Sequence, residues 1–283
     1  MAHAKVPIFK NMSKFQIACK PGHRASEHLF VIKSVFAYYQ AKNKALIMSS
    51  FDVKKMFNME NMFDVLKELY KSEVKGKVHR LIYNLNKNLR IKVQTSVGTS
   101  QSEDTGPIVG QVNVDAAVIS SVNLDNGVND AFVESDGELK YLELDLGPIL
   151  FMDDIFRMGD NVIAAQVANN LLEEMIGKKS LEFNLDKSAF MVMGNKKARK
   201  VIKSQLEKTL FIICGDRMKE VNILKYLGDF LGQSLEESVH QTVLQRIGLA
   251  KHSIYEIRAI IEDARATKLG GINIAYSLWN RQS

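Results

Sequence analysis

The segment that most limits how this chain can fold is PILFMDDIFRM, residues 148–158, in which two adjacent aspartates stand between two apolar runs. Such runs predict two buried strands, with Asp153 and Asp154 in a tight turn between them. Neighbouring carboxylates repel each other, so this turn is costly unless it is exposed to water or binds a cation. An ordinary surface turn remains an alternative, because aspartate is a favoured turn residue.

A second apolar run also ends in an acid. ALIMSSFDV, residues 45–53, predicts a buried strand that ends at Asp52, and the aromatic Phe57 follows five residues later. Carboxylate oxygens are the ligands that Mg²⁺ prefers, commonly beside substrate phosphates. Two such ions can activate an attacking hydroxyl and stabilise a leaving group. Asp52 could equally cap a following helix, and the sequence leaves this alternative open.

The rest of the pattern mixes helices and strands without a regular alternation, which predicts an α+β fold around a mainly antiparallel sheet. Helical periodicity covers residues 27–42, 58–72, 75–88, 161–179 and 236–279, and residues 110–124 predict a buried helix. Strand patterns cover residues 89–97, 141–158, 181–194 and 211–232. Residues 125–138 are polar and acidic, and we expect a loop there.

Charge is distributed unevenly along the chain. Residues 1–90 carry 17 Lys and Arg against 6 Asp and Glu, whereas residues 91–160 carry 3 against 13. Basic flanks around an acidic middle suit a protein that binds a polyanion and gathers carboxylates for metal ions. A basic protein with solvated lysines is the plainer alternative.

Nothing in the sequence predicts a membrane span or a signal peptide, since no apolar run reaches the required length. Cys19 and Cys214 lie far apart and lack the spacing of a zinc site. We therefore expect an intracellular, reducing compartment.

Six segments, taken in order, resemble the reverse transcriptase domain of non-LTR (LINE-type) retrotransposons, over residues 15–279. They are FQIACKPGHRASEHLF, SSFDVKKMF, LYKSEVKGKVHRLIYNLNKNLRIKVQTSVGTS with TGPIVGQVNVDAAVIS, FMDD, LEFNLDKSAFMVMG and KYLGDFL. The resemblance implies a right-hand polymerase core, with a fingers segment over residues 1–50, a palm with further fingers elements over 51–235, and the start of a helical thumb over 236–283. It implies RNA-directed DNA polymerase activity, in which dNTPs are added to a DNA primer on an RNA template, and it suggests a nuclear location.

The resemblance also implies roles for individual residues. Asp52, Asp153 and Asp154, with the Val53 carbonyl, would hold two Mg²⁺ or Mn²⁺ ions, and Lys187 would protonate the leaving pyrophosphate. A solvated lysine is the competing interpretation of Lys187.

Five further residues would contact the substrates. Phe57 would exclude a 2′-hydroxyl, unless it is an ordinary core aromatic, and Gln111 would pack against the nascent base pair. Lys20 and Arg24 would contact phosphates. Tyr226 begins a Tyr-Leu-Gly segment that would support the primer end, or would simply form a strand and turn.

The chain departs from the family at Val112, where the family usually has glycine, and it stops where the thumb would continue. These departures leave two other functions open. One is a truncated or domesticated descendant, catalytically weak or dead, that binds RNA or an RNA–DNA hybrid. The other is a structural or assembly module without catalysis.

Overall fold

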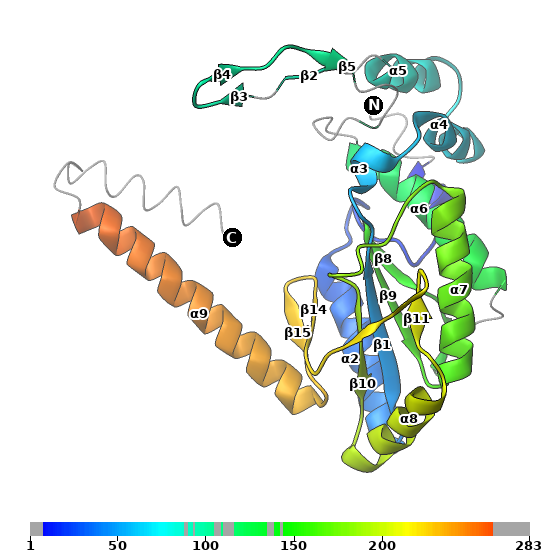
Figure 1. Cartoon of the computed structure of the whole chain (residues 1–283), viewed down its shortest axis with the longest axis vertical. Helices are drawn as coiled ribbons and strands as arrows, with labels where there is room; N and C mark the ends of the chain where they lie inside the picture. Colours follow the sequence, from blue (N-terminus) through cyan, green and yellow to red (C-terminus); the bar gives the residue numbers. More distant parts are fainter. Residues whose placement is uncertain are drawn as a thin grey trace.

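The centre of the fold is a five-stranded sheet with the strand order β13–β10–β1–β9–β8 (Figure 1). The strands are β1 (Leu46–Asp52), β8 (Ile149–Phe151), β9 (Asp154–Gly159), β10 (Ala189–Met193) and β13 (Lys219–Glu220). β1 pairs antiparallel with β9 and β10, β8 pairs antiparallel with β9, and β13 pairs parallel with β10. This computed structural model describes residues 8–87, 90–92, 94–104, 109, 116–134, 139–141 and 144–262.

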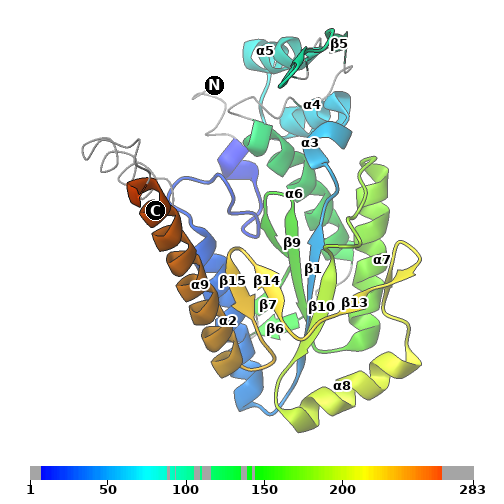
Figure 2. The same cartoon turned by 60° about the vertical axis from the view of Figure 1, so that its left-hand side comes forward.

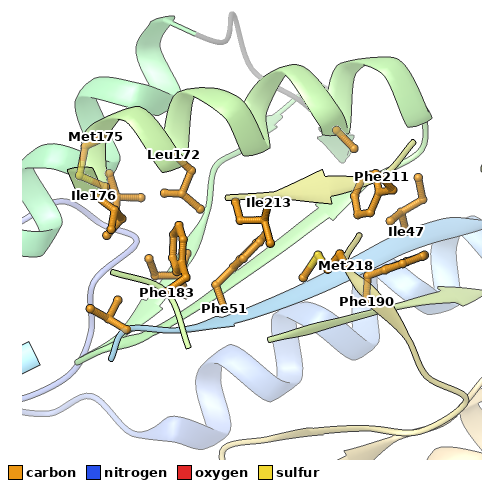
Figure 3. Packing of buried hydrophobic residues seen from close by; sticks show 14 of the residues in the cluster. Ile47, Phe51, Leu172, Met175, Ile176, Phe183, Phe190, Phe211, Ile213 and Met218 are labelled. Carbon is orange, nitrogen blue, oxygen red and sulfur yellow. The ribbon is translucent and has the colours of Figure 1, made fainter. Parts of the chain in front are cut away.

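Both faces of the sheet are covered, which explains why β1 is an apolar run rather than an alternating pattern. On the first face, Ile47 and Phe51 pack beneath α7 (Val162–Lys178), which contributes Leu172 and Met175, as Figure 3 shows. α8 (Lys196–Lys208) also packs against this face, through Ile202 and Leu206. The short strands β11 (Ile212–Ile213) and β12 (Asp216–Arg217) pair beside it.

The second face is covered by α2 (Ala25–Ala41) and by the hairpin of β14 (Leu224–Tyr226) and β15 (Asp229–Leu231). The ring centroids of Phe156 and Tyr226 lie 4.6 Å apart there. α9 (Leu235–Glu262) follows the hairpin and lies beside α2 (Figure 2). Buried Asp229 forms ion pairs with Lys33 of α2 and Arg246 of α9, so one carboxylate links three elements.

A third apolar cluster lies beyond the Asp52 end of β1. It is built from α4 (Met62–Lys71), α5 (Gly76–Asn86) and α6 (Ala116–Glu134), with α3 (Met56–Met59) between the cluster and β1. Three further pairs of strands are short. They are β2 (Arg90–Ile91) with β5 (Glu103–Asp104), β3 (Gln94–Thr95) with β4 (Gly98–Thr99), and β6 (Leu139–Tyr141) with β7 (Leu144–Leu146).

The predicted α+β class with a mainly antiparallel sheet is confirmed, whereas the division at residues 50 and 235 stays a prediction. The loop predicted over residues 125–138 is wrong, because α6 continues to Glu134. α8 was missing from the predicted elements. No helix in the part of the chain that the structure describes is both long enough and apolar enough to cross a membrane.

Candidate active site at one end of the sheet

The Asp-Asp segment forms a two-residue turn between β8 and β9, in which Phe151 pairs with Asp154 across the hairpin. Met152 and Asp153 make the turn itself, and Met152 has a left-handed backbone with φ of 57°. A non-glycine residue in this region is uncommon and needs support from its surroundings. Asp153 and Asp154 are both only partly buried, so their carboxylates reach solvent at this end of the sheet.

Asp52, about a hundred residues earlier in the sequence, stands directly opposite Asp154 in the pairing of β1 with β9. Directly opposed residues of an antiparallel pair project from the same face of the sheet, with Cβ atoms about 4.5–5.5 Å apart. Phe156, two residues after Asp154, packs on the face that carries α2, so Asp52 and Asp154 also project from that face. The structure thus brings together acids from two distant segments.

The end of β1 is fixed by the segment that precedes β10. The Asn184 amide donates to the Asp52 carbonyl at 2.8 Å, and the Asp52 amide donates to Ser188 Oγ at 3.2 Å. Between these contacts the chain turns at Asn184, whose carbonyl accepts from the amides of Lys187 and Ser188. The turn places Lys187 Nζ 3.6 Å from Asp52 Oδ1. The lysine side chain is 67% exposed, so its amine also reaches solvent beside the acids.

Burial and neighbouring carboxylates raise the pKa values of Asp153 and Asp154. Burial raises the pKa of Asp154 to about 6, and the carboxylates of Asp153 and Asp52 add to this effect. Burial also raises the pKa of Asp153, with Asp52 contributing in the same direction. Lys187 opposes both shifts, because its positive charge favours the ionised carboxylates.

The chemistry of these three side chains fits a hard divalent cation, which prefers carboxylate oxygens and would relieve their mutual repulsion. Their present orientation does not yet enclose one. Within the described ranges, no three His, Cys, Asp or Glu side chains lie close enough together to hold a metal ion. The side chains would therefore have to turn toward a common point to bind an ion together.

Gln16 supports the turn and is not predicted from the sequence, since a single glutamine between Phe15 and Ile17 gives no signal of its partners. It is fully buried, and its Oε1 accepts from the amides of Ala18 at 3.1 Å and Met152 at 3.4 Å. Its Nε2 donates to the Met152 carbonyl at 3.5 Å. Gln16 also bridges to Leu150 of β8. Its side chain therefore contacts the turn residue whose backbone is left-handed.

The Tyr-Leu-Gly segment forms β14 and a two-residue turn, in which Leu227 and Gly228 have φ of 48° and 78°. Tyr226 is buried, and its hydroxyl has no hydrogen-bond partner among the described residues. Burial raises the pKa of this phenol, and the nearby Asp154 carboxylate raises it further. The hydroxyl thus lies close enough to Asp154 for the two groups to interact electrostatically.

Phe57 lies in α3, just after β1, and packs against both the first-face cluster and the cluster beyond the Asp52 end. It is partly exposed, so both the gate and the core-aromatic interpretations stay open. Val53, whose carbonyl was expected to complete a metal shell, is buried and bridges to Phe183.

Of the three other predicted contact residues, the two that the structure describes, Lys20 and Arg24, do not join the acids. Lys20 Nζ donates to the carbonyls of Ser13 at 2.6 Å and Met12 at 3.3 Å, so its amine is bound internally. Arg24 is exposed at the start of α2, where its amide donates to Glu27. Gln111 lies outside the described residues, as does Val112. Their predicted roles stay predictions.

Comparison with known proteins gives a likeness in structure only. Neither a protein-family model nor a curated protein matches this sequence. Apo telomerase from Candida tropicalis, truncated from its C-terminal domain, matches with a TM-score of 0.55 at 11% identity, over 82% of this chain and 43% of that one. Telomerase from Candida albicans, in complex with a TWJ fragment of telomeric RNA, matches with a TM-score of 0.55 at 10% identity, over 81% and 37%.

A third structure, C. tropicalis telomerase with a TWJ fragment of telomeric RNA, has a TM-score of 0.56 at 9% identity, over 82% of this chain and 35% of that one. At such identities the likeness shows the fold alone, and this chain spans less than half the length of these telomerases. The fold is thus like that of part of these telomerases. The narrower resemblance to non-LTR retrotransposons rests on the sequence motifs.

Proposed function

We propose that this chain is the polymerase core of an RNA-directed DNA polymerase, which adds dNTPs to a primer 3′-end on an RNA template. The observation that carries the proposal is the pairing of Asp52 with Asp154, beside Asp153, at one end of a telomerase-like sheet. In this proposal the five-stranded sheet is the palm, the cluster of α4, α5 and α6 belongs to the fingers, and α9 begins the thumb.

The three aspartates would hold two divalent ions, Mg²⁺ or Mn²⁺, together with the Val53 carbonyl. Bound ions of this kind supply activation of the primer hydroxyl and stabilisation of the charge on the leaving pyrophosphate. Lys187, whose amine is exposed beside Asp52, would bind the pyrophosphate and donate a proton to it. Phe57 would exclude the 2′-hydroxyl, and Gln111 would pack on the nascent base pair.

The remaining contacts are to nucleic acid. Lys20 and Arg24 would contact phosphates, which for Lys20 requires its amine to leave the carbonyls that it now contacts. The telomerases of similar fold include complexes with a fragment of telomeric RNA, which supports RNA as a partner here. The same likeness supports a nuclear location.

A primer-extension assay on a poly(rA)/oligo(dT) template tests the proposal. We expect extension by the wild type with Mg²⁺ or Mn²⁺, and loss of about a hundredfold or more in Asp153→Ala, as for other removed charge-stabilising groups. Asp216→Ala, at an exposed aspartate of β12, is the matched control and should leave the rate unchanged. Extension by Asp153→Ala at the wild-type rate would contradict the proposal.

A second candidate is a non-catalytic descendant that binds RNA or an RNA–DNA hybrid. It is favoured by one observation, namely that the carboxylates in the described structure do not enclose a metal site. This candidate predicts RNA binding without extension by the wild type. A structural module, the third candidate, predicts neither binding nor extension.

A further inference from the structure

A basic surface lies at the end of the sheet opposite the aspartates. β1 runs from Leu46 to Asp52, so its two ends are about 20 Å apart at a rise of about 3.3 Å per residue. At the Leu46 end the loop of residues 42–44, which closes α2, meets the first turns of α8 (Figure 1). We name these two segments the basic end.

The two segments are held against each other by a close backbone approach. Gly194, just before α8, has φ of 131°, and a Cβ there would lie 2.9 Å from both the Lys44 carbonyl oxygen and Ala45 Cα. Glycine therefore allows a contact that other residues would prevent. Asn195 Nδ2 also donates to Asn43 Oδ1 at 2.9 Å. The relative position of the two segments is thus defined by the fold.

The basic end presents several unneutralised positive charges. Its exposed lysines are Lys42, Lys44, Lys196, Lys197 and Lys200. None of these five forms an ion pair within the ranges that the structure describes. Lys42 and Lys44 lie over the rings of Tyr38 and Tyr39, 5.7 and 6.0 Å from the ring centroids, and these contacts leave the charge in place.

The acids nearest to this surface are already engaged. Glu220 pairs with Lys203, two turns along α8 from Lys196. Asp160, at the end of β9, is hydrogen-bonded to the Tyr39 hydroxyl and raises the pKa of that phenol, behind the larger effect of burial. Neither carboxylate neutralises the five lysines.

The position of these lysines opposes helix stability. The N-terminus of a helix carries a partial positive charge, so a cation in the first turn is unfavourable. α8 begins with Lys196 and Lys197 and has no acid in its first turn. An anion at this surface would remove the cost, because it interacts favourably with both the lysines and the helix end.

The burial of the apolar side of α8 favours a nucleic acid over a lipid surface as the source of the anion. Ile202 and Leu206 are buried against the sheet, and Val201 is the one large apolar side chain exposed on α8, so the helix has no broad apolar face to insert into a lipid surface. Exposed lysines on a rigid, water-covered surface suit the phosphates of a nucleic acid strand, which they contact without reading its sequence.

We propose that the basic end binds the phosphate backbone of a single-stranded RNA arm that extends beyond the primer–template held at the aspartates. This inference rests on the proposed function, because it takes the aspartate end as the place where the primer–template lies. At the rise of about 3.4 Å per nucleotide of a stacked strand, the 20 Å between the two ends corresponds to about six nucleotides, and an extended single strand covers it with fewer. An arm of about two nucleotides is too short to reach the lysines even when it is fully extended, whereas an arm of about 20 nucleotides reaches them.

The test compares the binding of primer–templates whose single-stranded RNA arms have about 2 or about 20 nucleotides, with the wild type and the variant Lys196→Ala/Lys197→Ala/Lys200→Ala. We expect the variant to lose affinity for the long arm only. For a single strand, each phosphate contact contributes about 0.7 to the slope of the logarithm of the binding constant against the logarithm of salt concentration. The three lysines together should therefore contribute a slope of about two. Wild-type affinity for the long arm should thus fall about twentyfold more than the variant's between about 50 and 200 mM salt.

A charge-matched variant, with Lys196, Lys197 and Lys200 changed to arginine, should bind the long arm as the wild type does, and thermal unfolding checks that both variants are folded. The inference is overturned if the alanine variant keeps wild-type affinity for the long arm, or loses affinity for both arms equally. It is also overturned if the variant loses binding to phosphatidylserine vesicles but not to RNA. Extension of the short-arm substrate by the wild type reports separately on the proposed polymerase activity.

Discussion

Gln16→Leu is the substitution that best separates support of the turn from general stability. Leucine is close to glutamine in volume but removes both polar atoms, which leaves the buried Ala18 amide without its acceptor. An orphaned buried amide costs about 1–3 kcal/mol. The two contacts with Met152, at 3.4 and 3.5 Å, are long and contribute about 0.5 kcal/mol each. We therefore expect a loss of about 2–4 kcal/mol, which a domain of ordinary stability survives.

The effect on activity should exceed the effect on folding. Without Gln16, the left-handed Met152 loses its side-chain contacts, and the turn that carries Asp153 can shift. A displacement of about 1 Å in a positioned catalytic group can cost about a hundredfold in rate. We expect kcat for primer extension to fall by about ten- to a hundredfold in the folded variant, with KM for the primer–template little changed.

Asn86→Leu is the matched control. Asn86 is also a buried amide, and its Nδ2 donates to the Ile82 carbonyl within α5, away from the turn. Urea unfolding gives the stability of both variants, and kcat is compared at a temperature where both are folded. If Gln16→Leu retains the same kcat as Asn86→Leu, Gln16 does no more than stabilise the fold, and the reasoning is refuted.

Three further predictions concern His28, Phe57 and Tyr226. Burial lowers the pKa of His28 to about 4, so on acidification the imidazole is protonated in the unfolded chain at a higher pH than in the folded one. The free energy of unfolding should therefore fall as pH drops from about 6.5 toward 4. His28→Gln should flatten this part of the urea-unfolding profile by up to about 3 kcal/mol, whereas parallel profiles would contradict the assignment. If Phe57 is the gate, Phe57→Val should incorporate ribonucleotides while dNTP addition stays unchanged. If the variant instead loses activity equally on rNTPs and dNTPs and has a lowered Tm, Phe57 is a core aromatic. Tyr226→Phe should leave stability unchanged or about 1 kcal/mol higher, since it removes an unpartnered hydroxyl, and a lower midpoint in urea would disprove this.

The elements that the sequence predicted well are those whose burial shows directly in composition. β1, β8, β9 and β10 are covered on both faces, so each is an apolar run bounded by polar residues. The positions of Asp52 and Asp154 follow from those runs, because an acid at the first or last position of a buried strand lies at an end of the sheet. That the two would be direct cross-strand partners depended on the strand order, which the runs alone do not specify.

The later half of α6 could not be predicted, because its polar residues find buried partners from distant segments. Asp125 accepts from the Ser13 amide at 2.7 Å, and Asn126 Nδ2 donates to buried Glu68 at 2.8 Å. Local composition indicates a loop there, since unpaired polar groups are costly in a core. The partners lie 112 and 58 residues away, beyond the reach of any local pattern.

The cost of the acidic turn bears on the choice between the three candidate functions. At neutral pH the ionised Asp154 is disfavoured by burial and by the carboxylates of Asp153 and Asp52, so this arrangement weakens the fold. The same turn has a left-handed Met152, and the buried amide of Gln16 supports it. A protein that only binds RNA, or only assembles, would gain stability from amides in place of these acids. A polymerase that uses divalent ions needs the acids, and the ions offset their repulsion, which is why we favour the catalytic proposal.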